Sequence, residues 1–198
     1  RDRLRSRGLG DVYKRQVERC FGEARAAGFA SINMDLIAGL PGEDEAAFAR
    51  TLRRVVPLAP ENLTVHTLAL KRASRLMRER GDWSLPPAEA TAAMLEAAAA
   101  AAASLGQRPY YLYRQKYMSG NLENTGYALP GRECMYNIDM MEETVSILAH
   151  GACGISKRVF GAENRVERLP NPKDVATYEA KLPQLLADKR RLFCTAGD

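Results

Sequence analysis

The feature that most constrains the fold is an alternation of helical and extended patterns between residues 17 and 70. The first helical pattern ends at Gly28, a residue type that commonly terminates helices. Two largely apolar segments, Phe29–Ala38 and Leu63–Leu70, predict strands, and the helix between them begins after Gly42. A helix-strand-helix-strand order is typical of α/β folds in which the strands run parallel.

Beyond residue 70 the pattern no longer alternates regularly. An alanine-rich tract keeps Met94, Leu95 and Ala98 on one face, so we expect a packed helix there and not a linker. The expected elements are helices over 74–80 and 87–103, a strand over 110–118, an irregular segment over 119–131, a helix over 140–150, a hairpin with strands over 157–160 and 165–169, and a last helix that begins after Asn171.

The positive charge is concentrated at the start of the chain. Residues 1–16 carry six positive and two negative side chains and therefore supply +4 of the formal net charge of +5. This segment lacks helical or strand periodicity, and GLGDVYKRQ resembles translated sequencing-adapter read-through, so we treat 1–16 as non-native. The remaining chain is nearly neutral, which argues against a nucleic-acid partner. Its longest apolar run, around Ala97–Ala103, is far shorter than the roughly 20 residues of a membrane span.

The cysteines and histidines show no metal-ligand spacing. No two of the four cysteines form a CxxC pair, and no secretory signal is visible, so we expect reduced thiols in a cytoplasmic protein and no metal site. The histidines lie far apart in the sequence, and we expect both to be structural or solvated. The residues concerned are Cys20, Cys134, Cys153, Cys194, His66 and His150.

Asp35 is the position that points most directly to function. A carboxylate within a buried parallel strand costs several kcal/mol unless it is hydrogen-bonded. Asp35 also lies four residues before Gly39, near the end of the strand at which ligands of α/β sheets gather. It could hold a ribose hydroxyl or an amine; alternatively, it caps a loop or pairs with an arginine.

A tyrosine-rich block follows the alanine-rich helix and allows three interpretations. Aromatic faces beside cations could stack a flat macrocycle and pair with its carboxylates, or could bind single-stranded RNA. The block could also be an amphipathic strand at a domain junction. It comprises Tyr110, Tyr111, Tyr113 and Tyr117 interleaved with Arg108, Arg114 and Lys116, and the adjoining irregular segment carries Asn121, Glu123 and Asn124.

Several motifs together resemble one enzyme family. INMDLIAGLPGE at 32–43, followed by an apolar strand, is similar to the fifth and sixth strands of the barrel in radical S-adenosylmethionine enzymes. The segments PYYLYRQKYMSGNLENTGYALPG (109–131), YNIDMMEE (136–143) and GACGISK (151–157) resemble more specifically the HemZ-type branch of the oxygen-independent coproporphyrinogen III oxidases and dehydrogenases. The resemblance covers about residues 17–180.

The resemblance implies a fold, a cofactor and a reaction. Residues 17–72 would be the end of an incomplete α/β barrel, and 73–198 a mixed α+β C-terminal domain. Asp35, Ala69 and Ile155 would contact S-adenosylmethionine. The reaction would be oxidative decarboxylation of propionates to vinyl groups in anaerobic haem biosynthesis, with a porphyrinogen substrate, an electron donor and an electron acceptor. Substrate candidates are Tyr113, Arg114, Asn121, Glu123 and Asn124.

The sequence departs from this family at the cluster motif. Relatives bind a 4Fe–4S cluster through CxxxCxxC, and no such motif occurs here. In the family it precedes the region that begins at Val17, so we expect a C-terminal fragment of an oxidoreductase, with no catalytic residue in this chain and no radical chemistry by this chain alone. The alternatives are a haem-binding or haem-delivery protein on the same scaffold, or a non-catalytic binding module.

Overall fold

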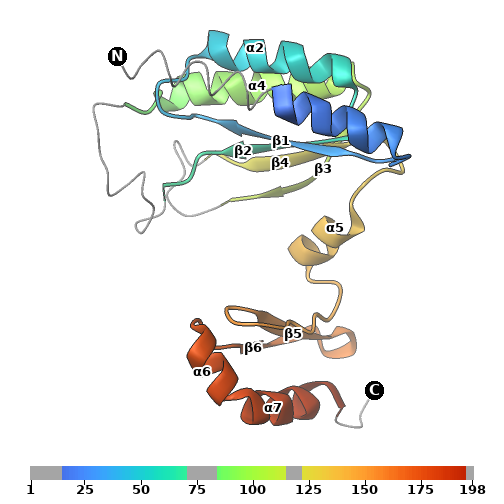
Figure 1. Cartoon of the computed structure of the whole chain (residues 1–198), viewed down its shortest axis with the longest axis vertical. Coiled ribbons are helices and arrows are strands. Elements are labelled where there is room, and N and C mark those ends of the chain that lie inside the picture. The colour runs from blue at the N-terminus through green and yellow to red at the C-terminus, as the bar shows by residue number, and fades with distance from the viewer. Residues whose placement is uncertain (1–14, 71–83, 115–121, 195–198) are drawn as a thin grey trace. The chain divides into compact units, whose positions relative to one another are not determined.

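The computed structural model describes residues 15–70, 84–114 and 122–194 (Figure 1). Within it the chain divides into two compact units, Arg1–Glu133 and Cys134–Asp198. The first contains a four-stranded sheet with helices, and the second a two-stranded sheet with helices. The fold is therefore mixed α/β, as the sequence predicts.

The first unit is built on a sheet with the strand order β1-β2-β4-β3. The strands are β1 (Asn33–Ala38), β2 (Asn62–Thr67), β3 (Arg108–Tyr113) and β4 (Asn124–Ala128). β1 and β2 run parallel, which confirms the prediction from the alternating pattern. β4 is antiparallel to both β2 and β3, so the sheet is mixed.

Helices cover one face of this sheet. The chain is helical over residues 15–26, and α2 (Glu45–Val55), the short 3-10 helix η1 (Val56–Leu58) and α4 (Ala88–Ser104) follow. Figure 1 shows α2 and α4 on the same side of the strands. Asp44 caps α2 by accepting a hydrogen bond from the Ala47 N–H at 2.7 Å, which satisfies a donor that the helix itself leaves unpaired.

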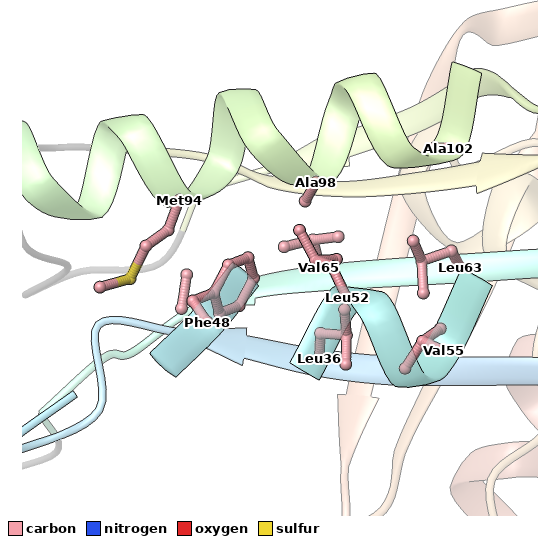
Figure 2. Packing of buried hydrophobic residues seen from close by; sticks show 10 residues of the cluster. Leu36, Phe48, Leu52, Val55, Leu63, Val65, Met94, Ala98 and Ala102 are labelled. Atoms are coloured by element: carbon pink, nitrogen blue, oxygen red, sulfur yellow. The ribbon is translucent and has the colours of Figure 1, made fainter. Parts of the chain in front are cut away.

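The hydrophobic core lies between these helices and the strands (Figure 2). Alternate residues of β1 and β2 point toward α2 and α4, as expected for strands whose side chains alternate between faces. In α4 the small side chains of Ala98 and Ala102 are fully buried, which confirms the expected packed helix. The core residues are Leu36, Ala38, Phe48, Leu52, Val55, Leu63, Val65, Met94, Ala98 and Ala102.

The second unit contains the expected hairpin. β5 (Ile155–Phe160) and β6 (Arg165–Pro170) pair antiparallel, and the 3-10 helix η3 (Gly161–Glu163) forms their connection. α5 (Met135–Glu142) precedes the hairpin. Two helices, α6 (Val175–Ala180) and α7 (Leu182–Cys194), follow it.

Three expectations beyond residue 118 are wrong. The segment expected to be irregular over 119–131 contains β4, which pairs on both sides. The helix expected over 140–150 is replaced by α5, because Glu143 adopts a left-handed conformation that ends the helix and Ile147 bridges to Lys157. The last helix starts at the cap Asp174 and not after Asn171, and it is followed by a second helix.

Other expectations lie wholly or partly outside the described residues. The helix expected over 74–80 falls there, and the strand expected over 110–118 is described only to Arg114, with β3 ending at Tyr113. The first compact unit extends to Glu133, because α4 packs on β1 and β2, and β4 pairs with β2. The assignment of 17–72 and 73–198 to a barrel segment and a C-terminal domain stays a prediction.

Candidate functional site

The face of the first sheet opposite the helices carries a group of polar and aromatic side chains, which we call the open face. The strand register places them together, since Asp35 lies beside Thr64 and Ile37 lies beside His66. On the other side of β2, Thr64 pairs with Gly126, which in turn pairs with Tyr111. The open face comprises Asn33, Asp35, Thr64, His66, Tyr111 and Tyr113.

Asp35 extends from the middle of β1 onto the open face. Its side chain is 60% exposed, so the expectation of a buried carboxylate is wrong: the buried residues of β1 are its neighbours Leu36 and Ala38. Asn33 Nδ2 donates to Asp35 Oδ1 at 2.6 Å, and Thr64 Oγ1 donates to Asn33 Oδ1 at 3.1 Å. These contacts hold one carboxylate oxygen in place and leave the carboxylate accessible to a ligand.

His66 lies between Asp35 and the tyrosines. Its Nε2 is 3.9 Å from Asp35 Oδ2, and its Nδ1 is 3.3 Å from the Tyr113 hydroxyl. The pKa of Asp35 is lowered from its ordinary value, chiefly by the interaction with His66 and less by those with Asn33 and Thr64, while partial burial acts in the opposite direction. His66 was expected to be structural or solvated, and its place in this polar array, 30% exposed, is compatible with that expectation.

The tyrosines reach the array from β3, across β4. The rings of Tyr111 and Tyr113 are stacked, with centroids 6.3 Å apart and planes 4° from parallel. Tyr111 lies directly over Gly126: a Cβ atom there would come within 1.9 Å of the Tyr111 ring. Burial is the main reason that the pKa of Tyr111 is raised from its ordinary value. A glycine in β4 therefore permits the aromatic part of the open face.

Three of the expected substrate residues lie near the adjoining ends of β3 and β4. Arg114 and Glu123 form an ion pair of 2.7 Å in which the arginine is largely exposed. Asn124 is buried, and its Oδ1 accepts a hydrogen bond from the Thr67 N–H at 2.7 Å, which favours a structural contribution to the sheet. Asn121 lies outside the described residues.

The two other residues expected to contact the cofactor lie on different parts of the chain. Ala69 lies two residues after the end of β2 and is partly buried. Ile155 begins β5 in the second unit and is 54% exposed. Asp35 also borders a hollow of about 600 Å³ beside β1, on the side of the helix over residues 15–26. The roles of Asp35, Ala69 and Ile155 at a cofactor stay predictions.

The cysteines do not supply a cluster site in the part of the chain that the structure describes. All four are free and exposed, and among the described residues no three side chains of histidine, cysteine, aspartate or glutamate come together as metal ligands. The donor set of these residues therefore does not fit a 4Fe–4S cluster, which needs several converging thiolates. Within the same described ranges, no helix has the length and apolarity to cross a membrane.

Sequence reasoning found Asp35 and Tyr113 but missed Asn33, Thr64 and His66. Thr64 and His66 share a face of β2 because they are two residues apart, but the sequence does not give the register that brings them to Asp35. Aligning the two predicted strands at their ends, Ala38 and Leu70, would instead place Thr67 beside Asp35.

Comparison with known proteins supports the resemblance found in the sequence. The chain is 42% identical over 166 residues to the oxygen-independent coproporphyrinogen-III oxidase-like protein HemZ of Bacillus subtilis, an alignment that covers 84% of this chain and 33% of the relative. It is 28% identical over 183 residues to the oxygen-independent coproporphyrinogen III oxidase of Pseudomonas aeruginosa, covering 88% of this chain and 37% of the relative. The chain thus spans about a third of the length of these two relatives.

Two further comparisons concern fold and alternative function. The structure of coproporphyrinogen III oxidase (HemN) from Escherichia coli, described as a radical SAM enzyme, matches with a TM-score of 0.57 and 22% identity, over 83% of this chain and 36% of that chain. The haem chaperone HemW of Mycobacterium tuberculosis is 27% identical over 118 residues, covering 59% of this chain and 27% of the relative. No family model matches the chain.

Proposed function

Because this chain is a relative of the HemZ-type oxygen-independent coproporphyrinogen III oxidases, we propose that it is part of a cytoplasmic oxidoreductase that decarboxylates coproporphyrinogen III. The reaction converts propionate side chains to vinyl groups and requires an electron donor and an electron acceptor. The observation that carries this proposal is the 42% identity to HemZ over 84% of the chain. The polar open face adds support, since it offers a carboxylate and stacked aromatic rings on one surface.

In this proposal the chain contributes binding residues. Asp35 accepts hydrogen bonds from hydroxyl or ammonium groups of S-adenosylmethionine, while Ala69 and Ile155 line the same cofactor. Tyr113 and Arg114 face the substrate, the first by aromatic contact and the second by pairing with a propionate. Glu123, Asn124 and Asn121 complete the proposed substrate set.

The cluster of the proposed enzyme is not assigned to this chain. The sequence has no CxxxCxxC motif, and the described cysteines do not converge, so no reaction step is attributed to the 198 residues alone. When bound and reduced, S-adenosylmethionine would supply a 5′-deoxyadenosyl radical for hydrogen abstraction, and this chain's share would be to bind and orient the cofactor.

Calorimetric titration of the chain with S-adenosylmethionine tests the cofactor assignment. We expect saturable binding that the D35N variant weakens by about tenfold or more, because the variant loses a charged acceptor. The matched control is D139N, since Asp139 also holds one local hydrogen bond, from Thr144 at 2.6 Å, but belongs to the second unit. Equal binding by D35N and the wild type would contradict the role of Asp35.

An anaerobic assay tests the reaction itself. The full product of the source gene, supplied with a reductant and S-adenosylmethionine, should consume coproporphyrinogen III and release carbon dioxide. No consumption by a protein loaded with iron and sulfide would count against the proposed reaction.

A haem-delivery protein is the second candidate, favoured by the similarity to the haem chaperone HemW. Such a protein would bind haem with a shifted Soret band and would leave coproporphyrinogen III unchanged. Adding haem and coproporphyrinogen III to separate samples of the same preparation therefore distinguishes the two functions.

A further inference from the structure

His66 links the carboxylate of the open face to one of its aromatic residues. It lies on β2, between Asp35 on β1 and Tyr113 on β3. One ring nitrogen is directed to Asp35 Oδ2 at 3.9 Å, and the other is 3.3 Å from the Tyr113 hydroxyl. The ring is therefore oriented by contacts at both nitrogens, as in histidines whose second nitrogen is held by a fixed partner.

The other carboxylate oxygen of Asp35 is already held. Asn33 donates to Oδ1 at 2.6 Å, and Thr64 in turn donates to the amide oxygen of Asn33 at 3.1 Å. Oδ2 faces His66 at a distance longer than a hydrogen bond, so it keeps room for a ligand group while it remains within the field of the imidazole. Asp35 thus has one oxygen held by the side chain of Asn33 on the same strand and one oxygen that faces His66.

The geometry of Tyr113 explains why the imidazole keeps this orientation. The His66 and Tyr113 rings meet edge to face, with centroids 6.4 Å apart and planes at 70°. His66 is only 30% exposed, so much of its surface is in contact with protein. The titratable groups that contact it in the described sheet are Asp35 from β1 and Tyr113 from β3.

From this arrangement we infer that His66 is a positioning residue that sets the direction of Asp35 Oδ2 for a ligand bearing an ammonium group or adjacent hydroxyl groups. The inference deepens the proposed function and rests on it for the identity of the ligand, S-adenosylmethionine. The positioning itself rests only on contacts within the sheet. The lowered pKa of Asp35, to which His66 contributes most, agrees with this role.

The test compares four variants by two measurements. H66F removes both nitrogens and keeps a ring, whereas H66Q restores a donor within reach of Asp35. Y113F removes only the hydroxyl that holds the ring, and H150F is the control at the other, exposed histidine. The measurements are calorimetric affinity for S-adenosylmethionine and the NMR titration of the Asp35 carboxyl carbon, with far-UV circular dichroism to verify folding.

We expect H66F to weaken S-adenosylmethionine binding by about tenfold, H66Q to recover most of the affinity, and Y113F to fall between them. The titration midpoint of Asp35 should rise in H66F toward the ordinary aspartate value and stay unchanged in H150F. Wild-type affinity together with an unchanged Asp35 midpoint in H66F would overturn the inference. Loss of binding that H66Q does not restore, with the Asp35 midpoint unchanged, would also overturn it, because that result indicates a purely structural role.

The two proposals fail in different ways. If the wild-type chain does not bind S-adenosylmethionine, the cofactor assignment fails, and the Asp35 titration still decides whether His66 positions the carboxylate. If the wild type binds and D35N does not, but H66F binds normally and leaves the Asp35 midpoint unchanged, the cofactor assignment stands and the role of His66 is refuted.

Discussion

Replacing Gly126 with alanine should displace Tyr111 from the open face. A Cβ atom at Gly126 would lie 1.9 Å from Tyr111 Cε1 and 2.4 Å from Cδ1. Both distances are far inside the ordinary carbon–carbon contact distance of about 3.5–4.0 Å. The ring must therefore move away from β4, and it loses the burial that raises the pKa of Tyr111.

The expected change in the free energy of unfolding of G126A combines two opposing effects. Overpacking of a fitted contact costs about 1–3 kcal/mol. Alanine restricts the unfolded chain more than glycine does, and at a strand position this raises the free energy of unfolding by about 0.5–1 kcal/mol. We therefore expect G126A to lower the free energy of unfolding by about 0.5–2 kcal/mol.

Urea unfolding followed by far-UV circular dichroism measures this change. The matched control is G22A, because Gly22 lies in the helix over residues 15–26 and a Cβ atom there meets nothing within 4 Å. G22A should raise stability by about 0.5–1 kcal/mol, since alanine is the better helix former. In a Y111A background the cost of G126A should disappear, because the atoms that it would meet are gone. A G126A protein as stable as G22A, or a cost that persists in Y111A, would refute the reasoning.

Three further predictions concern the first unit. F48A should destabilise the chain by about 3–5 kcal/mol in urea unfolding, because Phe48 is 1% exposed and its removal leaves a cavity in the core. D44A should cost about 0.5–2 kcal/mol in the same assay, through loss of the cap to the Ala47 N–H; an unchanged midpoint would contradict the cap. Partial burial raises the pKa of Glu61, but bonds from Arg25 and the backbone outweigh it and the pKa is lowered from 4.5. The ionised carboxylate therefore stabilises the folded state above pH 4.5, and this stability is lost as the pH falls through the lower pKa of the folded state. Below pH 4.5 the free energy of unfolding of E61Q should therefore depend less steeply on pH than that of the wild type.

The first half of the first unit could be predicted because its information is local. Helical and strand periodicities, the glycine and proline positions and the acidic residues before α2 determine those elements over short distances. β4 could not be predicted in the same way. Its sequence, NTGYA, has little apolar pattern, and its strand conformation depends on pairing with β3 and with β2, which lies far earlier in the chain.

The second unit illustrates a different limit. The apolar spacing over 140–150 fits a helix, but Ile147 exchanges backbone hydrogen bonds with Lys157 at 2.7 and 2.8 Å. A segment of moderate helix propensity thus becomes part of a β arrangement because a partner strand is available. The hairpin itself was predictable, since strand residues flank a short connection with glycine and asparagine.

For the candidate site, the identity of Asp35 could be predicted and its environment could not. The expectation of burial treated the whole strand as enclosed, whereas β1 is buried on one face, with Asp35 on the other. His66 was missed because a lone histidine gives no signal until the register between two strands is known. Burial and hydrogen-bond partners are properties of that register, which the sequence alone leaves open.

The same register separates the site from the core. Leu36 and Val65 face the helices, while Asp35 and His66, their neighbours in sequence, belong to the open face. Because side chains alternate strictly along a strand, a slip of one residue would place the carboxylate against α2 and α4 and expose the leucine, at a cost of several kcal/mol for the buried charge alone. Core packing thus holds the open face in register, although the two sets of side chains lie on opposite faces of the sheet. Ligand binding at Asp35 should therefore survive a conservative core change such as V65I wherever the sheet remains folded, whereas H66F should impair it with the core intact.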